Sequence, residues 1–352
     1  MNIFFLYSHF MPYNLSGIEA LIKISNVRVH IVHYPSTKEF PYEFLSDQNI
    51  TYYSIKDNSR IELIKLIEKL KPRFIFITGW GNKEYLAVAK YARSKAIPVI
   101  TGCDTQWRGD LRQIIAMTFS GILIRKYFDY IMIPGFYQYE YARLLGFNRS
   151  RILHPVYTCN LELFNEIFVK YQVEKLCSYP KNILYVGRFE HVKGLNILID
   201  AFLKIEEKNG WTLTIAGDGS LKDEIVKRIG GRSDIILKEY IHQEGMSDII
   251  RNSGVFCLPS HYEPWGVVLH EFAAAGLILL ASDICGSSSA FIKEEFNGFT
   301  FRSGNVLSLR EKIIRIMEMS DEQKIIFSER SNKLAQVITP ELYASNFIKF
   351  LS

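Results

Sequence analysis

Short apolar runs alternate with helical patterns along nearly the whole chain of 352 residues. Runs such as Ile-Phe-Phe-Leu at 3–6 and Phe-Ile-Phe-Ile at 74–77 are apolar at every position, so strands built from them need cover on both faces. Strand and helix patterns in alternation are typical of stacked βαβ units. The sequence therefore predicts an α/β fold of doubly wound, Rossmann-like parallel sheets.

The strand patterns form two series, separated by the polar stretch 174–181. We expect strands at 2–7, 28–32, 50–53, 74–78, 98–101 and 130–134, and then at 182–186, 212–216, 235–237, 255–258, 277–281 and 298–301. Helical patterns lie at 17–25, 60–70, 82–95, 110–127 and 136–145, and then at 193–208, 220–230, 243–252, 266–275, 287–293 and 306–318.

These series predict an N-terminal domain over 1–172 and a second domain over 173–335. In the remaining segment, 336–352, Pro340 opens a helix that we expect to pack back on the first domain. Ligands of doubly wound sheets bind outside the carboxyl ends of the strands. Two such domains facing each other would enclose the site in a cleft.

Composition excludes several classes of protein. With 48% hydrophobic and 22% charged residues, the chain is neither disordered nor collagen-like. We find no run of about 18 uncharged apolar residues and no secretion signal. Five widely spaced cysteines argue against a disulfide framework or a Cys-based zinc site, so we expect a cytoplasmic protein. The chain has no stripe of interleaved aromatic and basic residues, and nucleic acid is not an expected partner.

Charge is unevenly divided along the chain. Residues 1–172 carry 21 Lys and Arg against 14 Asp and Glu, whereas the remainder carries 21 against 23. The first domain therefore presents a positive field that suits an anionic partner such as a phosphate or a bilayer surface. A merely soluble basic surface is an equally good explanation. The pattern at 111–126 is apolar on one broad face and basic at its ends, so it suits either packing on the sheet or peripheral contact with an anionic membrane.

Two strand ends in the second half carry residues that suit phosphate. Gly187 allows a sharp turn after the strand at 182–186, and Arg188 and Lys193 follow in the loop. A guanidinium fork and a compact ammonium together suit a diphosphate, although two surface bases beside a turn would look the same. Gly217 in the Gly-Asp-Gly stretch at 217–219 permits close approach of a ligand to the main chain, or simply a tight βα turn.

The segment 259–271 carries the strongest signal. Pro264 favours an extended Glu263, so Glu263 is expected in the loop and a helix near Gly266. The first N–H groups of such a helix, at Gly266, Val267 and Val268, lack intrahelical acceptors and can bind phosphate. Glu271 would lie one to two turns further on, where a carboxylate suits a vicinal diol such as a ribose. A helix start with two solvated glutamates is the plainer alternative.

Glu263 and Glu271, with seven residues between them, resemble the E-x7-E motif of retaining glycosyltransferases of the GT-B fold, family four, also called glycosyl transferases group 1. The resemblance extends over most of 182–302, through the Gly-Arg at 187–188, the Lys-Gly at 193–194, the Gly-Asp-Gly at 217–219, the Pro-Ser at 259–260 and the glycines at 286 and 298.

This resemblance implies a role for each matching residue. Arg188 and Lys193 would hold the donor diphosphate and stabilise the departing nucleotide, and Glu263 would contact the transferred sugar, which makes these three the catalytic set. Glu271 would bind the ribose. The other implied donor-binding positions are Gly187, Gly217, Ile241 beside the base, and the main chain at Gly266, Val267 and Val268. No D-x-D triad is present, so we expect neither a metal nor another cofactor.

The first half matches the family only in part. Gly17 falls near the place of a flexible Gly-Gly loop after the first strand, with Ser16 instead of the first glycine. Cys103 stands where the family usually has a histidine that touches the sugar, and Asp104 follows it. By resemblance, Gly17 and Asp104 are the expected acceptor-side residues.

The resemblance thus implies a retaining, metal-independent transferase that moves a sugar from a nucleotide sugar, expected to be a UDP-sugar, to a glycan or lipid-linked acceptor in bacterial surface polysaccharide synthesis. By the same resemblance, the acceptor is expected to attack from the face that the nucleotide leaves. Three alternatives stay open: a GDP-mannose-type donor, a sugar-nucleotide 2-epimerase, and a non-catalytic sugar-nucleotide binding module.

Overall fold

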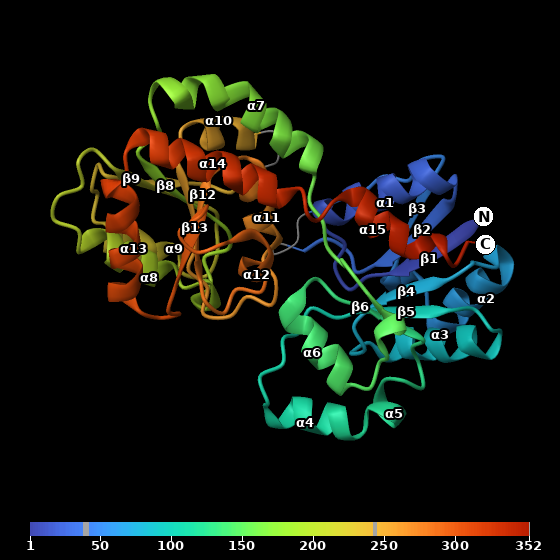
Figure 1. Cartoon of the computed structure of the whole chain (residues 1–352). Coiled ribbons are helices and arrows are strands. Elements are labelled where there is room, and N and C mark those ends of the chain that lie inside the picture. The colour runs from blue at the N-terminus through green and yellow to red at the C-terminus, as the bar shows by residue number, and fades with distance from the viewer. Residues whose placement is uncertain (38–41, 242–244, 352) are drawn as a thin grey trace. The chain divides into compact units, whose positions relative to one another are not determined.

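The computed structural model describes residues 1–37, 42–241 and 245–351, and the chain divides into two compact units. The first unit consists of Met1–Cys159 and Ile338–Ser352, and the second is Asn160–Val337. Each is a parallel α/β sheet covered by helices (Figure 1). The doubly wound architecture predicted from the sequence is therefore confirmed for both.

The first unit has seven strands in the order β3-β2-β1-β4-β5-β6-β7, all paired in parallel. They are β1 (Asn2–Leu6), β2 (Arg28–His33), β3 (Ile50–Ser54), β4 (Ile75–Thr78), β5 (Val99–Gly102), β6 (Tyr130–Met132) and β7 (Ile152–Leu153). Its helices are α1 (Pro12–Ser25), α2 (Arg60–Leu70), α3 (Lys83–Ser94), α4 (Leu111–Thr118), α5 (Ser120–Leu123), α6 (Phe136–Leu144) and α15 (Pro340–Ile348), with 3-10 turns at Ile55–Asp57 and Arg149–Arg151.

Alternate residues of β1 enter two different cores. Ile3 and Phe5 pack on the side covered by α1 and α15, whereas Phe4 and Leu6 pack on the side covered by α2, α3 and α6. Because successive side chains of a strand point to opposite faces, an all-apolar strand needs helices on both. The C-terminal helix α15 lies beside α1 (Figure 1), as the sequence predicts.

The second unit has six parallel strands in the order β10-β9-β8-β11-β12-β13. They are β8 (Asn182–Val186), β9 (Thr212–Ala216), β10 (Ile235–Lys238), β11 (Val255–Leu258), β12 (Ile278–Ser282) and β13 (Gly298–Phe301). The helices are α7 (Leu161–Cys177), α8 (Leu195–Leu203), α9 (Lys222–Ile229), α10 (Met246–Arg251), α11 (Val267–Ala274), α12 (Ser288–Phe291), α13 (Val306–Glu318) and α14 (Asp321–Ala335), with a 3-10 turn at His191–Lys193.

In each sheet the strand order reverses direction at one place. In the first unit this switch lies between β1 and β4, and in the second between β8 and β11. The crevice at the carboxyl ends of the strands beside such a switch is where open α/β sheets bind ligands. The fold therefore points to the loops that follow β1 and β4 in the first unit and to those that follow β8 and β11 in the second.

Several details differ from the sequence-based expectations. The predicted domain boundary at 172/173 falls inside α7, which packs on α10, α11 and α14, so the boundary is at 159/160. The predicted helix 110–127 breaks into α4 and α5 at Phe119, and the predicted helix 17–25 begins earlier, at Pro12. Of the predicted helix 243–252, residues 243 and 244 lie outside the described residues.

A membrane-spanning helix needs both length and an apolar sequence, and none of the helices in the described part of the chain has the two together.

Candidate functional site

The predicted donor residues surround the carboxyl ends of β8 and β11. Gly187 and Arg188 follow β8 directly, and Lys193 ends the 3-10 turn before α8. Glu263 lies in the loop between β11 and α11. These two loops flank the switch point of the second sheet, so the fold brings the two charged motifs to one edge.

The loop after β8 touches the loop after β11 so closely that glycine is required. Gly194 has φ +64° and immediately precedes α8, and a Cβ built on it would lie 2.1 Å from the carbonyl oxygen of Pro259. The backbone N–H of His261 donates to the Val192 carbonyl at 2.8 Å. A real Cβ never approaches an oxygen so closely. Only a glycine at position 194 therefore lets the two loops pack at this distance.

Lys193 and Glu263 form an ion pair across these two loops. The Nζ of Lys193 lies 2.6 Å from Oε2 of Glu263, and their side chains are 19% and 10% exposed. The Ser260 hydroxyl donates to the same carboxylate oxygen at 3.1 Å. The lysine, the glutamate and the serine thus form one partly buried polar cluster at the edge of the sheet.

The turn after β9 packs on the loop after β8. Gly217 has φ +149°, and a Cβ there would lie 2.0 Å from the carbonyl oxygen of Gly187. The Phe189 N–H donates to the Asp218 carbonyl, and the Ser220 hydroxyl donates to the Glu190 carboxylate at 3.0 Å. Gly217 is therefore needed for close backbone packing, whichever ligand binds beside it.

Helix α11 begins where the sequence predicts. Gly266 has φ +91° and precedes the helix, and Gly266, Val267 and Val268 are all partly exposed. The N–H groups in a first turn have no acceptor within their own helix, and the helix dipole adds partial positive charge there. This end of α11 can therefore bind an anionic group beside Glu263.

Glu271 lies in the second turn of α11, and the residue as a whole is only partly exposed. Burial raises the pKa of the Glu271 carboxyl to about 7. The low local polarity that disfavours the charged form also strengthens any hydrogen bond that the carboxylate accepts. Hydroxyl donors such as those of a diol would stabilise the ionised form.

Sequence reasoning assigned no role to three contributors to this edge. Ser260 and Glu190 hold the loops through the contacts described above, and His261 stacks on His191 with 5.6 Å between ring centroids. Burial lowers the pKa of His261, and electrostatic repulsion from the neighbouring His191 lowers it further. A contact between Ser260 and Glu263 could have been predicted, because Ser260 stands three residues before Glu263 in the same loop.

The remaining predicted residues are spread over both units. Ile241 follows β10 in the second unit, directly after the exposed Tyr240. In the first unit, Asp104 follows β5 and accepts a hydrogen bond from the Tyr157 hydroxyl at 3.2 Å. Burial of the adjacent Cys103 raises its thiol pKa to about 12, so the thiol stays protonated.

Gly17 does not occupy a flexible loop, contrary to expectation. It is buried inside α1, and a Cβ there would lie 2.6 Å from Cδ1 of Tyr343 in α15. Pro12 starts the helix early, because proline is well suited to the first helical position. The observed role of Gly17 is to let α15 pack closely, and its contact with an acceptor stays a prediction.

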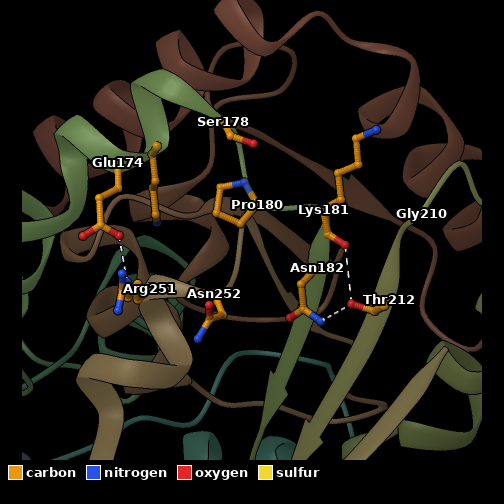
Figure 2. A pocket seen from close by; sticks show the side chains of 10 residues that line it. Glu174, Ser178, Pro180, Lys181, Asn182, Gly210, Thr212, Arg251 and Asn252 are labelled. Carbon is orange, nitrogen blue, oxygen red and sulfur yellow. Dashed lines mark hydrogen bonds and ion pairs between the residues drawn. The ribbon is translucent and has the colours of Figure 1, made fainter. Parts of the chain in front are cut away.

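A cavity of about 500 Å³ lies at the opposite edge of the second sheet (Figure 2). Asn182 and Thr212, at the amino ends of β8 and β9, line it together with the Arg251–Glu174 ion pair. Lys175 also lines it, and burial lowers the pKa of its amine to about 8. None of the predicted donor residues lines this cavity, so it is separate from the site at the carboxyl edge.

Comparison with known proteins finds similarity to glycosyltransferases. Residues 171–333 match the model of the family Glycosyl transferases group 1. An uncharacterized glycosyltransferase of Methanocaldococcus jannaschii is 31% identical over 140 residues, and the amylovoran biosynthesis glycosyltransferase AmsD of Erwinia amylovora is 28% identical over 145 residues. Each match covers 39% of this chain and 36% of the relative, so only about a third of either relative is represented.

The whole chain matches a solved structure. HepE of Anabaena, crystallised in complex with UDP, superposes with a TM-score of 0.75 at 13% sequence identity, over 99% of this chain and 98% of HepE. The two parallel-sheet, Rossmann-like units therefore have the GT-B fold. The match to the Glycosyl transferases group 1 model lies within the second unit, which contains Lys193, Glu263 and Glu271.

Proposed function

We propose that the protein is a retaining, metal-independent glycosyltransferase that uses a nucleotide-diphosphate sugar, with UDP as the expected nucleotide. The observation that carries the proposal is the joining of Lys193, Glu263 and Ser260 at the switch point of a Glycosyl transferases group 1 domain. The UDP bound to HepE, whose fold the chain shares, supports the choice of a nucleotide donor.

In this proposal the donor diphosphate lies against Arg188, Lys193 and the first turn of α11. Arg188 is exposed beside Gly187, where its guanidinium can reach an incoming anion. As the bond from the anomeric carbon to the phosphate oxygen breaks, its electron pair goes to that oxygen. Fixed cations and N–H groups stabilise the growing negative charge, which lowers the barrier without a metal ion.

The acceptor hydroxyl attacks the anomeric carbon on the face from which the nucleotide departs. Its oxygen forms the new glycosidic bond, and its proton passes to the leaving phosphate oxygen, so atoms and charge balance. Glu263 accepts hydroxyl hydrogen bonds from the transferred sugar, and Glu271 accepts those of the ribose. The proposed acceptor is a glycan or a lipid-linked sugar of a bacterial surface polysaccharide, a class supported by the similarity to AmsD.

The first experiment is a thermal-shift panel of UDP, GDP, ADP and their sugars, with and without EDTA. A ligand that binds only the folded protein raises the unfolding midpoint. A shift with UDP-sugars that EDTA leaves unchanged is expected. If only GDP-mannose raised the unfolding midpoint, the donor would be GDP-mannose and not a UDP-sugar. If no ligand raised the midpoint, nucleotide-sugar binding would be contradicted.

Turnover then separates the enzymatic alternatives. Transfer requires an acceptor, whereas a 2-epimerase converts the donor without one, and a binding module does neither. NMR of the product should show the anomeric configuration of the donor. Arg188→Gln should lower turnover by about a hundredfold or more, as for loss of one charge-stabilising group. Arg251→Gln, which changes an exposed arginine beside the opposite cavity, is the matched control and should leave turnover unchanged.

A further inference from the structure

The outer surface of α4 and α5 is apolar, although both helices lie on the first unit's surface (Figure 1). Leu111 is 72% exposed and Ile122 is 63% exposed. The exposed large apolar residues of this segment, here called the α4–α5 surface, are Leu111, Ile114, Ile115, Phe119, Ile122 and Leu123. Six such side chains within 13 consecutive residues form more than the scattered apolar exposure of an ordinary surface.

The amphipathic arrangement of α4 is inverted. Its buried residue is a polar one, Gln113, which is 5% exposed. The Gln113 side chain donates to the Gln106 carbonyl at 2.6 Å and accepts from the Arg108 N–H at 2.7 Å, and the Asp110 carboxylate caps the helix by accepting from the Gln113 N–H at 2.9 Å. A surface helix normally turns its apolar stripe to the core. Here, directed hydrogen bonds hold the polar side inward and so fix the apolar side outward.

The charges around this surface are mostly positive. Residues 108–126 contain Arg108, Arg112, Arg125 and Lys126 against a single carboxylate, Asp110. Arg112, Arg125 and Lys126 are exposed, and they stand at both ends of the apolar stretch. A second copy of the chain, meeting this surface through a two-fold axis, would set these cations against one another. An anionic surface, in contrast, complements them.

We propose that the α4–α5 surface binds the headgroup region of an anionic lipid bilayer. The apolar side chains enter the boundary between headgroups and acyl chains, and the flanking cations pair with lipid phosphates. This inference goes beyond the proposed function, because it depends neither on sugar transfer nor on any donor residue. Membrane contact of this kind would keep the protein on the surface where a lipid-linked acceptor is found.

Vesicle sedimentation of the full chain tests the proposal. The protein should sediment with vesicles of phosphatidylcholine containing about a third phosphatidylglycerol, and much less with phosphatidylcholine alone, because the cations require anionic lipid. Leu111→Gln with Ile122→Gln should weaken partitioning by at least about tenfold, since two aliphatic side chains no longer enter the bilayer. The matched control is Leu45→Gln with Ile61→Gln, which changes two residues of the same unit that are 91% and 60% exposed and should bind like the wild type.

A second pair of variants tests the charges separately. Arg112→Gln with Lys126→Gln should weaken binding to anionic vesicles by about tenfold, whereas Lys65→Gln with Lys69→Gln, on exposed positions of α2, should not. If the two double variants lost vesicle binding equally, only the net charge of the protein would matter. That result would overturn the assignment of membrane binding to the α4–α5 surface. Failure of the wild-type protein to sediment would also overturn it, as would a dimer, detected by light scattering, that the Leu111→Gln/Ile122→Gln variant abolishes.

Discussion

Lys193 and Glu263 are 70 residues apart in the sequence, yet their charged atoms lie 2.6 Å apart in the second unit. The pair joins the loop after β8 to the loop after β11, and Ser260 adds a hydrogen bond to the same carboxylate oxygen. Because both side chains are mostly buried, neither charge is fully screened by water. The ion pair therefore affects both folding and any anion that binds beside it.

The first prediction concerns the contribution of this pair to stability. Lys193→Met leaves the Glu263 carboxylate buried without its cation and should lower the free energy of unfolding by about 2 kcal/mol. Adding Glu263→Gln removes the stranded charge, so the double variant should recover at least about 1 kcal/mol relative to additivity. Urea denaturation of the four proteins measures the coupling.

The exposed ion pair between Arg251 and Glu174 is the matched control for that cycle. Nε of Arg251 lies 2.7 Å from Oε2 of Glu174, but both side chains are about half exposed. Water screens such pairs, so Arg251→Met and Glu174→Gln should show no measurable coupling. If the Lys193–Glu263 cycle is also additive, the pair does not hold the loops together.

The second prediction concerns Glu271 and pH. Its folded-state pKa of about 7 lies above the ordinary value of 4.5, so the folded protein binds this proton more tightly than the unfolded chain does. Below pH 4.5 the carboxyl is protonated in both states and does not lower the free energy of unfolding. As pH rises from 4.5 toward 7, the carboxyl lowers the free energy of unfolding progressively, by up to about 3 kcal/mol. Glu271→Gln should raise the unfolding midpoint at pH 8 and leave it unchanged at pH 4.

The third prediction concerns ligand binding by the same carboxylate. A ribose diol donates its hydrogen bonds to the ionised form, so affinity for a UDP-sugar should rise as pH increases from 6 to 8. Calorimetry should use the sugar nucleotide rather than UDP, because a terminal phosphate titrates near pH 6 and would confuse the profile. Glu271→Gln should bind more weakly and lose the pH dependence. A variant that keeps the wild-type affinity and profile would exclude the ribose role.

Much of the fold could be predicted because its strands are apolar on both faces. Every predicted strand is present, and the two-residue β7 was missed because it is too short to show a pattern. Helix α7 was missed since its exposed face also carries apolar residues, Val169, Val173 and Leu176, which obscure the periodicity. Helix α14 was missed for the opposite reason, because it buries polar residues such as Lys324 and Ser331.

The candidate site was predictable in kind but not in its contacts. Charge type, glycine spacing and Pro264 placed Arg188, Lys193 and Glu263 in loops at strand ends. That Lys193 and Glu263 touch depends on β8 and β11 being neighbours, which no local pattern reveals. The role of Gly17 depends on Tyr343, near the other end of the sequence, and so could not be read from its surroundings.

The fourth prediction compares two glycines with similar backbone angles. Gly194 has φ +64° and Gly231 has φ +72°, so alanine at either position meets the same left-handed penalty of about 1–2 kcal/mol. A Cβ at Gly231 meets nothing within 4 Å, whereas one at Gly194 lies 2.1 Å from the Pro259 carbonyl oxygen. Gly194→Ala should therefore destabilise the protein by about 2 kcal/mol more than Gly231→Ala in urea denaturation, the usual scale of an overpacking clash. If the two variants lowered the free energy of unfolding equally, the two loops would be able to move apart at no energetic cost.

The last prediction concerns the glycine in α1. Replacing a glycine inside a helix by alanine ordinarily stabilises a protein by about 0.5–1 kcal/mol. Gly17→Ala should do the reverse, by about 1–3 kcal/mol, because the new methyl group meets the Tyr343 ring. Gly121→Ala in α5 is the control, since the nearest atom is the flexible end of Arg125, 3.4 Å away, and thermal unfolding should show the ordinary small stabilisation or no change, but no loss. With Tyr343→Ala already present, the ring is gone and Gly17→Ala should cost nothing further; a continuing loss would show that the strain comes from α1 itself and not from the packing of α15.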